Sequence, residues 1–172
     1  MERRSLLKIL AAGALVERIQ AQQPPKFEFF NAEQQRLVDR LAEMILPADD
    51  HSPGAREARV SEFIDLYVAH SPQEEKDVWR SGLELVKEEA QRSFGKPFVD
   101  GSPAEQDALM RRMAANEVDP STDLERFFAR LKELTVRGYY ASPIGLHREL
   151  QYQGNVPLMD YPACDHAAHG TE

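Results

Sequence analysis

The chain has 172 residues, of which 42% are hydrophobic and 29% are charged. This is the size and composition of one folded domain with a core, and it excludes a disordered chain. The formal net charge is −8, and an acidic protein repels both the phosphate backbone of nucleic acids and anionic membrane surfaces. We therefore expect no nucleic-acid partner.

The N-terminal residues have the layout of an export signal. Arg3 and Arg4 are adjacent, and they precede a short apolar stretch and a cleavage point after Ala21. The apolar stretch is too short to span a bilayer. The run R-R-x-L-L-K resembles the twin-arginine signal, whose pathway exports folded proteins. We therefore predict a periplasmic protein with a signal peptide at residues 1–21; the alternative is a basic amphipathic helix that begins the domain.

Behind a lead-in at residues 22–30, several segments place apolar residues at helical spacing. The predicted helices begin at or near Asn31, Val60, Ser71, Ser102 and Ser121. Some of them open with a capping box, in which a serine or asparagine and a glutamate or glutamine satisfy each other's backbone amides. The predicted capping boxes are residues 31–34, 71–74 and 102–105.

The predicted helices end at residues that stop helices. Pro47 ends the first, Gly95 ends the third, and the fifth ends close to Gly138. No run alternates apolar and polar residues as a strand would. The sequence therefore predicts an all-α fold, a single-domain bundle of about five helices over residues 31–166, with a tail at residues 167–172.

From Tyr139 onward, an irregular segment rich in aromatic residues, proline and glycine replaces the helical pattern. We expect it to contact a partner chain, because aromatic side chains are enriched at interfaces; the alternative is that it wraps its own bundle. The predicted partner-binding residues are Tyr139, Tyr140, Tyr152, Tyr161 and Cys164. Cys164 is the only cysteine, and in an oxidising compartment it either forms an intermolecular disulfide or remains a buried free thiol.

Two clusters contain residue types that bind metal ions. Asp49, Asp50 and His51 are consecutive in a predicted loop. Neighbouring side chains point in different directions, so we expect these residues to cap a helix or to be solvated. The second cluster is a C-x-H-x-x-H pattern that begins at Cys164 and lacks a fourth protein ligand. The sequence also lacks a glycine-rich phosphate loop and a haem attachment motif, so it predicts no catalytic, cofactor-binding or metal residue.

The chain resembles the gluconate 2-dehydrogenase subunit 3 family over roughly residues 30–166. The resemblance depends on several short motifs in a fixed order behind the twin-arginine-like signal. These motifs are Ile45–Asp50, Pro53–Ala55, Phe63–Asp65, Gly138–Leu146, Leu150–Asn155 and Tyr161–His166.

The resemblance implies a complex in which this chain is the non-catalytic small subunit. Its partner would be a large flavoprotein of the glucose–methanol–choline oxidoreductase type, which would hold FAD and oxidise a sugar, glycoside or sugar acid. A cytochrome c or another carrier would accept the electrons, and any membrane association would come through the complex. The small subunit would escort the large one during export. The alternatives are a stand-alone periplasmic metal-binding helical protein and a general chaperone.

Overall fold

The computed structural model describes residues 27–152 and 154. Over this range the chain is all-helical and contains no strand, which confirms the predicted fold class. The α-helices are α2 (Ala32–Ile45), α3 (Val60–Ala69), α4 (Gln73–Phe94), α5 (Pro103–Met113) and α6 (Asp123–Ala141). Two short helices accompany them, the 3₁₀-helix η1 (Phe98–Asp100) and the π-helix η2 (Gly145–Glu149). None of the helices in the described range has the length and apolar character needed to cross a lipid bilayer.

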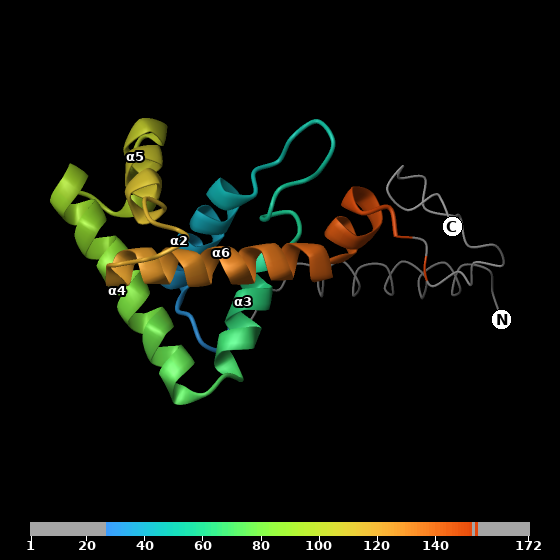
Figure 1. Ribbon diagram of the computed structural model, residues 1–172, viewed down its shortest axis with the longest axis horizontal. Coiled ribbons are helices and arrows are strands. Elements are labelled where there is room, and N and C mark those ends of the chain that lie inside the picture. The colour runs from blue at the N-terminus through green and yellow to red at the C-terminus, as the bar shows by residue number, and fades with distance from the viewer. Residues whose placement is uncertain (1–26, 153, 155–172) are drawn as a thin grey trace, which may run out of the picture.

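Helix α6 is the central element of the bundle. Figure 1 shows α3 and α4 as two arms of a V, with α6 crossing both arms. Helix α6 also contacts α2 and α5, so each of the other α-helices in the described range packs against it. The chain then continues from the end of α6 into η2, beyond the bundle. The chain therefore leaves the packed bundle at the C-terminal end of α6.

The core is built from the apolar stripes that the sequence predicts. Trp79 of α4 is fully buried and meets the Phe127 ring of α6 edge-on, with 5.4 Å between ring centroids. One turn along α4, Gly82 leaves room for the same phenylalanine, because a Cβ atom there would lie 2.1 Å from the Phe127 ring. Any side chain at this position would force α4 and α6 apart.

A partly buried polar network ties α3, α4 and α6 together. Oε1 of Glu75 accepts hydrogen bonds from Nε1 of Trp79 at 2.9 Å and from Nε of Arg130 at 2.7 Å. Nη2 of Arg130 also donates to the Tyr67 hydroxyl at 3.2 Å. Burial is the largest influence on the pKa of Arg130 and lowers it, but hydrogen bonds to Glu75, Glu133 and Tyr67 outweigh burial and raise the pKa overall. The guanidinium therefore stays charged and joins all three helices.

The predicted helix ends are confirmed in most places. Asn31 and Gln34 form the capping box of α2, and Ser102 and Glu105 form that of α5. Gly95 ends α4 in the left-handed conformation, at φ +69°, which glycine adopts without steric cost.

The capping box predicted at Ser71 is wrong. Pro72 occupies the N-cap position of α4, and no side chain there accepts from the helix amides. The Ser71 hydroxyl instead donates to the backbone carbonyl of Tyr67 at 2.8 Å. Because the turn between α3 and α4 is so short, the serine hydroxyl bonds to a backbone carbonyl at the end of α3 and not to the backbone amides at the start of α4.

The fifth predicted helix ends close to Gly138, as the sequence predicts. Helix α6 continues through Gly138 to Ala141, because Gly138 serves a contact and not a helix stop. A Cβ atom at Gly138 would lie 2.6 Å from Cδ1 of Phe63. The missing side chain thus lets the Phe63 ring of α3 pack directly on the backbone of α6.

Glu125 holds the start of α6. Thr122 is the N-cap residue, and the Glu125 carboxylate accepts from the backbone amides of Ser121 at 2.8 Å and Thr122 at 2.9 Å. It also accepts from the Ser121 hydroxyl and from Nδ2 of Asn116. The amide of Thr122, then that of Ser121, lowers the pKa of Glu125 from 4.5 to about 2. The ionised carboxylate is therefore the form that the fold stabilises.

We predict that Glu125→Gln destabilises the protein in a pH-dependent manner. The pKa of Glu125 is lower in the folded state than in the unfolded state, so its contribution is fully present above the unfolded value of about 4.5. The contribution is lost as the pH falls through about 2. Urea denaturation should show a large difference between wild type and variant near neutral pH, and this difference should shrink on acidification.

The matched control is Glu88→Gln. Glu88 is exposed on α4 and, over the described range, makes no hydrogen bond or ion pair. Its substitution should have a small effect at every pH. A Glu125→Gln effect that stayed constant down to pH 2 would contradict the assignment.

Candidate functional site

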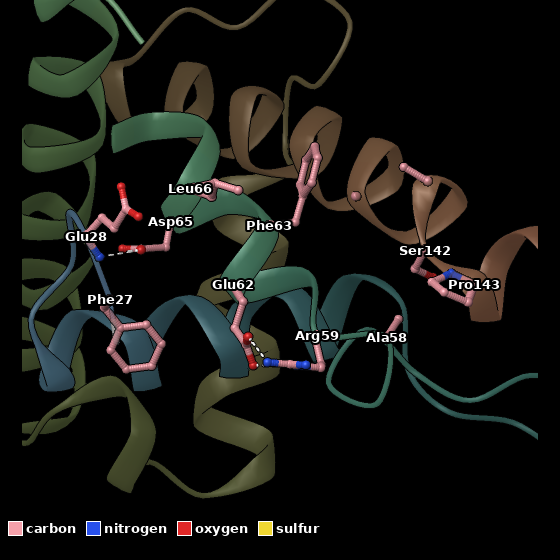
Figure 2. A pocket seen from close by; sticks show the side chains of 12 residues that line it. Phe27, Glu28, Ala58, Arg59, Glu62, Phe63, Asp65, Leu66, Ser142 and Pro143 are labelled. Atoms are coloured by element: carbon pink, nitrogen blue, oxygen red, sulfur yellow. Dashed lines mark hydrogen bonds and ion pairs between the residues drawn. The ribbon is translucent and has the colours of Figure 1, made fainter. Parts of the chain in front are cut away.

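A surface groove lies between the N-terminal segment, α3 and the end of α6. It encloses about 450 Å³, and we call it the α3 groove. Figure 2 shows its lining, in which Phe27 and Pro143 approach from segments far apart in the sequence. The apolar side chains of the lining are Phe27, Ala58, Phe63, Leu66, Ala141 and Pro143. The α3 groove therefore has an apolar interior, with charged side chains among the lining residues.

One wall of the α3 groove is fixed by the carboxylate of Asp65. This side chain is only 4% exposed, and it accepts hydrogen bonds from three consecutive backbone amides. The distances are 2.7 Å to Glu28, 3.1 Å to Phe29 and 2.7 Å to Phe30. Hydrogen bonds to an ionised acceptor are short and strong, and here they offset the cost of burying a charge. Asp65 thus fastens the segment before α2 to the side of α3.

Aromatic contacts extend this attachment to α4. Phe30 is buried against Trp79, with 5.7 Å between ring centroids, and Phe29 meets Phe30 edge-on at 5.1 Å. The guanidinium of Arg80 lies 4.9 Å from the centroid of the Phe29 ring, a favourable cation–π geometry. The segment at residues 28–30 is therefore held by α3 through hydrogen bonds and by α4 through ring packing.

Two of the charged side chains in the α3 groove, Arg59 and Glu62, are paired with each other. Nε of Arg59 donates to Glu62 at 2.7 Å, and Figure 2 shows this pair inside the groove. The hydrogen bond to Glu62, followed by the charge of Glu62, raises the pKa of Arg59. Arg59 also adopts a left-handed backbone conformation, at φ +55°, which costs a residue other than glycine about 1–2 kcal/mol. The groove thus contains a local backbone strain, which is typical of functional sites.

Leu66 is a large apolar side chain of the α3 groove that is exposed to solvent. It is 52% exposed, and it separates the groove from a second depression of about 600 Å³ that reaches Pro72. The rings of Phe63 and Tyr67 stack beside it with 6.3 Å between centroids. An exposed leucine between two apolar depressions is typical of a protein–protein contact.

The model of the gluconate 2-dehydrogenase subunit 3 family matches residues 32–157, which is more than half of the chain. The chain belongs to this family. The matched range contains every helix from α2 to η2, including the part of α3 that carries Asp65 and Leu66. No curated protein and no solved structure gives a significant match.

The family match confirms most of the resemblance that the sequence predicts, and by its name the family supplies a subunit of a dehydrogenase. The motif Tyr161–His166 lies beyond the matched range. Arg3, Arg4, Tyr161 and Cys164 lie outside the residues that the structure describes, so their roles stay predictions.

Asp49 organises a turn in this family member. Its carboxylate accepts from the backbone amides of His51 at 2.8 Å and Ser52 at 2.7 Å. The amide of His51, then that of Ser52, lowers the pKa of Asp49. Among residues 27–152 and 154, no group of three ligating side chains could hold a metal ion. Asp49 therefore caps the turn that contains Asp50 and His51.

The role predicted for Tyr139 requires correction. Its side chain is only 4% exposed, and its hydroxyl donates to the backbone carbonyl of Pro53 at 2.7 Å and contacts the Ser52 hydroxyl. The tyrosine thus connects the end of α6 to the loop before α3. Burial leaves almost none of the Tyr139 side chain accessible to a partner. Its hydrogen bonds instead stabilise the protein's own fold.

Two other tyrosines that the sequence predicts to bind a partner, Tyr140 and Tyr152, are accessible. Tyr140 is 36% exposed and Tyr152 is 44% exposed. Tyr140 lies in the last turn of α6, Tyr152 follows η2, and neither lines the α3 groove. Their contact with a partner stays a prediction.

Sequence patterns did not single out Asp65 or Leu66 as site residues. Helix α3 buries Val60, Ile64 and Val68, and it also carries apolar side chains on its outer face. A helix that is apolar on most sides is expected to pack against more than one other surface. The sequence signal for Asp65 was its position beside Ile64, which places a carboxylate on the buried side of α3.

We predict that Asp65→Asn destabilises the fold by about 2–3 kcal/mol, because an asparagine offers one acceptor oxygen and turns an NH₂ group toward backbone donors. Urea denaturation monitored by circular dichroism measures the loss. The control is Asp107→Asn, an exposed partner of Arg111 on α5, which should change stability by less than about 0.5 kcal/mol. Equal effects at the two positions would show that the Asp65 carboxylate does not hold the N-terminal segment.

Proposed function

We propose that this chain is the non-catalytic small subunit of a flavin-dependent dehydrogenase that oxidises a sugar, glycoside or sugar acid. The observation that carries the proposal is the family match over residues 32–157. In the proposed complex, the chain binds a large flavoprotein of the glucose–methanol–choline oxidoreductase type. A cytochrome c or a similar carrier takes the electrons onward.

The α3 groove supplies the surface for this contact. Its interior is apolar, Leu66 is half exposed, and Tyr140 and Tyr152 add accessible aromatic side chains near the same end of the molecule. Glu62 is paired with Arg59, and Asp65 is occupied by backbone amides. Groups engaged in this way support binding and orientation better than proton transfer, which needs a group free to accept or release a proton. These features favour a docking surface over an active site.

The same lining argues against a flavin site in this chain. The pyrophosphate of FAD is anionic and is normally held by backbone amides of a glycine-rich turn at the start of a helix. The α3 groove instead presents the carboxylates of Glu28, Glu62 and Asp65, and its single guanidinium, Arg59, is already paired. The residues present do not fit FAD, so we assign the flavin to the large subunit.

The sequence at the N-terminus adds a role in export. A twin-arginine signal serves proteins that fold before they cross the membrane, and a flavoprotein must fold to hold its cofactor. A small subunit that carries Arg3 and Arg4 can therefore bring a loaded large subunit into the periplasm. A disulfide from Cys164 to the large subunit, one of the two states that the sequence allows, would make the contact permanent.

We predict that Leu66→Glu weakens the complex by at least about tenfold, because it places a charge on an apolar surface that the complex would bury. The tagged chain is expressed in its native host and purified, and the eluate is examined for flavin absorbance and for dye reduction with sugars and sugar acids. Val78→Glu is the matched control, since Val78 is 43% exposed on α4 and is not part of the α3 groove. It should retain the flavoprotein.

Two results would contradict this proposal. The first is a wild-type chain that elutes without any flavoprotein, and the second is dye-reducing activity from the chain purified alone. Several unrelated clients in the eluate would identify a general chaperone instead of a dedicated subunit.

We predict that changing both Arg3 and Arg4 to lysine stops export of the chain and leaves the flavoprotein in the cytoplasm. Positive charge is preserved in this variant, so a loss of export reports recognition of the arginine pair. Cell fractionation followed by flavin measurement locates both subunits. Lys8→Arg is the control and should export normally; a flavoprotein that reaches the periplasm without the small subunit would refute the escort role.

A further inference from the structure

Gln35 on α2 is a buried glutamine whose amide has no hydrogen-bond partner. The residue is 5% exposed, and within the described range neither Oε1 nor Nε2 forms a hydrogen bond. Buried polar atoms in native proteins almost always have partners, because an unpaired one loses its bonds to water without compensation. An amide with both ends unpaired therefore indicates a site that is completed by another molecule.

A second buried glutamine shows how this fold treats an amide that serves structure. Gln106 on α5 is 3% exposed, and its Nε2 donates to the backbone carbonyl of Phe98 at 2.8 Å. Its Oε1 accepts from Nε and Nη2 of Arg40 at 2.9 and 2.6 Å. Gln106 thus has partners at both ends of its amide, which makes it a direct comparison for Gln35.

Gln35 lines a depression of about 620 Å³ between α2, α3 and Phe27, which we call the α2–α3 depression. Phe27 supplies an aromatic surface, and Arg36, Asp39 and Glu62 supply charged groups. The depression shares Phe27 and Glu62 with the α3 groove. It therefore continues the proposed docking surface around the N-terminal segment.

Within the described part of the chain, one cation of the α2–α3 depression, Arg36, has no partner. Asp39 is paired with Arg56 at 2.8 Å, and Glu62 is paired with Arg59. Arg36 is exposed, and no hydrogen bond or ion pair to another residue of the described range involves it. The unpaired guanidinium favours an anionic ligand.

We propose that the α2–α3 depression receives an extended, acidic segment of the large subunit. The N–H and C=O of one residue in an extended chain lie side by side, and they match the acceptor and donor of the Gln35 amide. A carboxylate on the same segment pairs with Arg36. Because the amide atoms are covered in the free chain, the amide turns toward the depression when the segment enters. This inference rests on the proposed function.

The test compares Gln35→Met with Gln106→Met in the full chain. Methionine has nearly the shape of glutamine without its polar atoms, so Gln35→Met removes an unpaired amide and should raise the Tm of the free chain by roughly 2–5 °C. It should also weaken binding to the purified large subunit by about tenfold, measured by calorimetry. Gln106→Met removes a paired amide and should lower the Tm.

A third variant examines the charge. Arg36→Gln should weaken binding to the large subunit at low salt, and the difference from wild type should shrink as the salt concentration rises. A difference that does not depend on salt would overturn the pairing of Arg36 with a carboxylate.

The outcomes separate this inference from the proposed function. A lower Tm for Gln35→Met would show that the amide binds an internal water in the free chain, and it would overturn the inference. Unchanged binding of Gln35→Met to the large subunit, with Leu66→Glu still defective, would overturn it and leave the docking function intact. Failure of the wild-type chain to bind any flavoprotein would count against the proposed function itself.

Discussion

The docking side of this protein depends on one buried carboxylate. Asp65 lies on the inner side of α3, where an ionised group is costly unless its oxygens are fully bonded. The amides of Glu28, Phe29 and Phe30 provide those bonds. Because these residues directly precede α2, the same interaction sets where α2 begins relative to α3. The walls of the α3 groove and of the α2–α3 depression therefore share a single anchor.

On its other side, α3 is held by the network around Arg130. The guanidinium bonds to Glu75 of α4 and to Tyr67 of α3, and it extends from the centre of α6. A helix fixed in this way on two sides can leave its third side apolar and exposed without loss of order. This explains how a domain of modest size displays Leu66 on a rigid support, which lowers the entropic cost of binding.

The sequence predicts those features of the fold that depend on residues close together along the chain. Apolar stripes at helical spacing and the capping box at Asn31 require only local geometry, and both are present. Ser71 and Tyr139 were misassigned, and the packing role of Gly138 was missed, because all three depend on other elements: a short turn, the loop before α3 and the ring of Phe63.

The candidate site was less predictable for the same reason. The partners of Asp65 are backbone amides more than thirty residues away, as the separation of 35 to Phe30 shows. Backbone donors have no signature in a sequence. The unpaired amide of Gln35 is likewise visible only when every neighbouring donor and acceptor is placed. The family resemblance, in contrast, was readable from short motifs because they keep their order along the chain.

The position of Trp79 has a practical consequence. It is the only tryptophan of the chain, it is fully buried, and it touches both Phe30 and Phe127. Its indole therefore senses the N-terminal segment, α4 and α6 at once. Fluorescence from this one ring can follow detachment of the segment separately from collapse of the helices, without any added label.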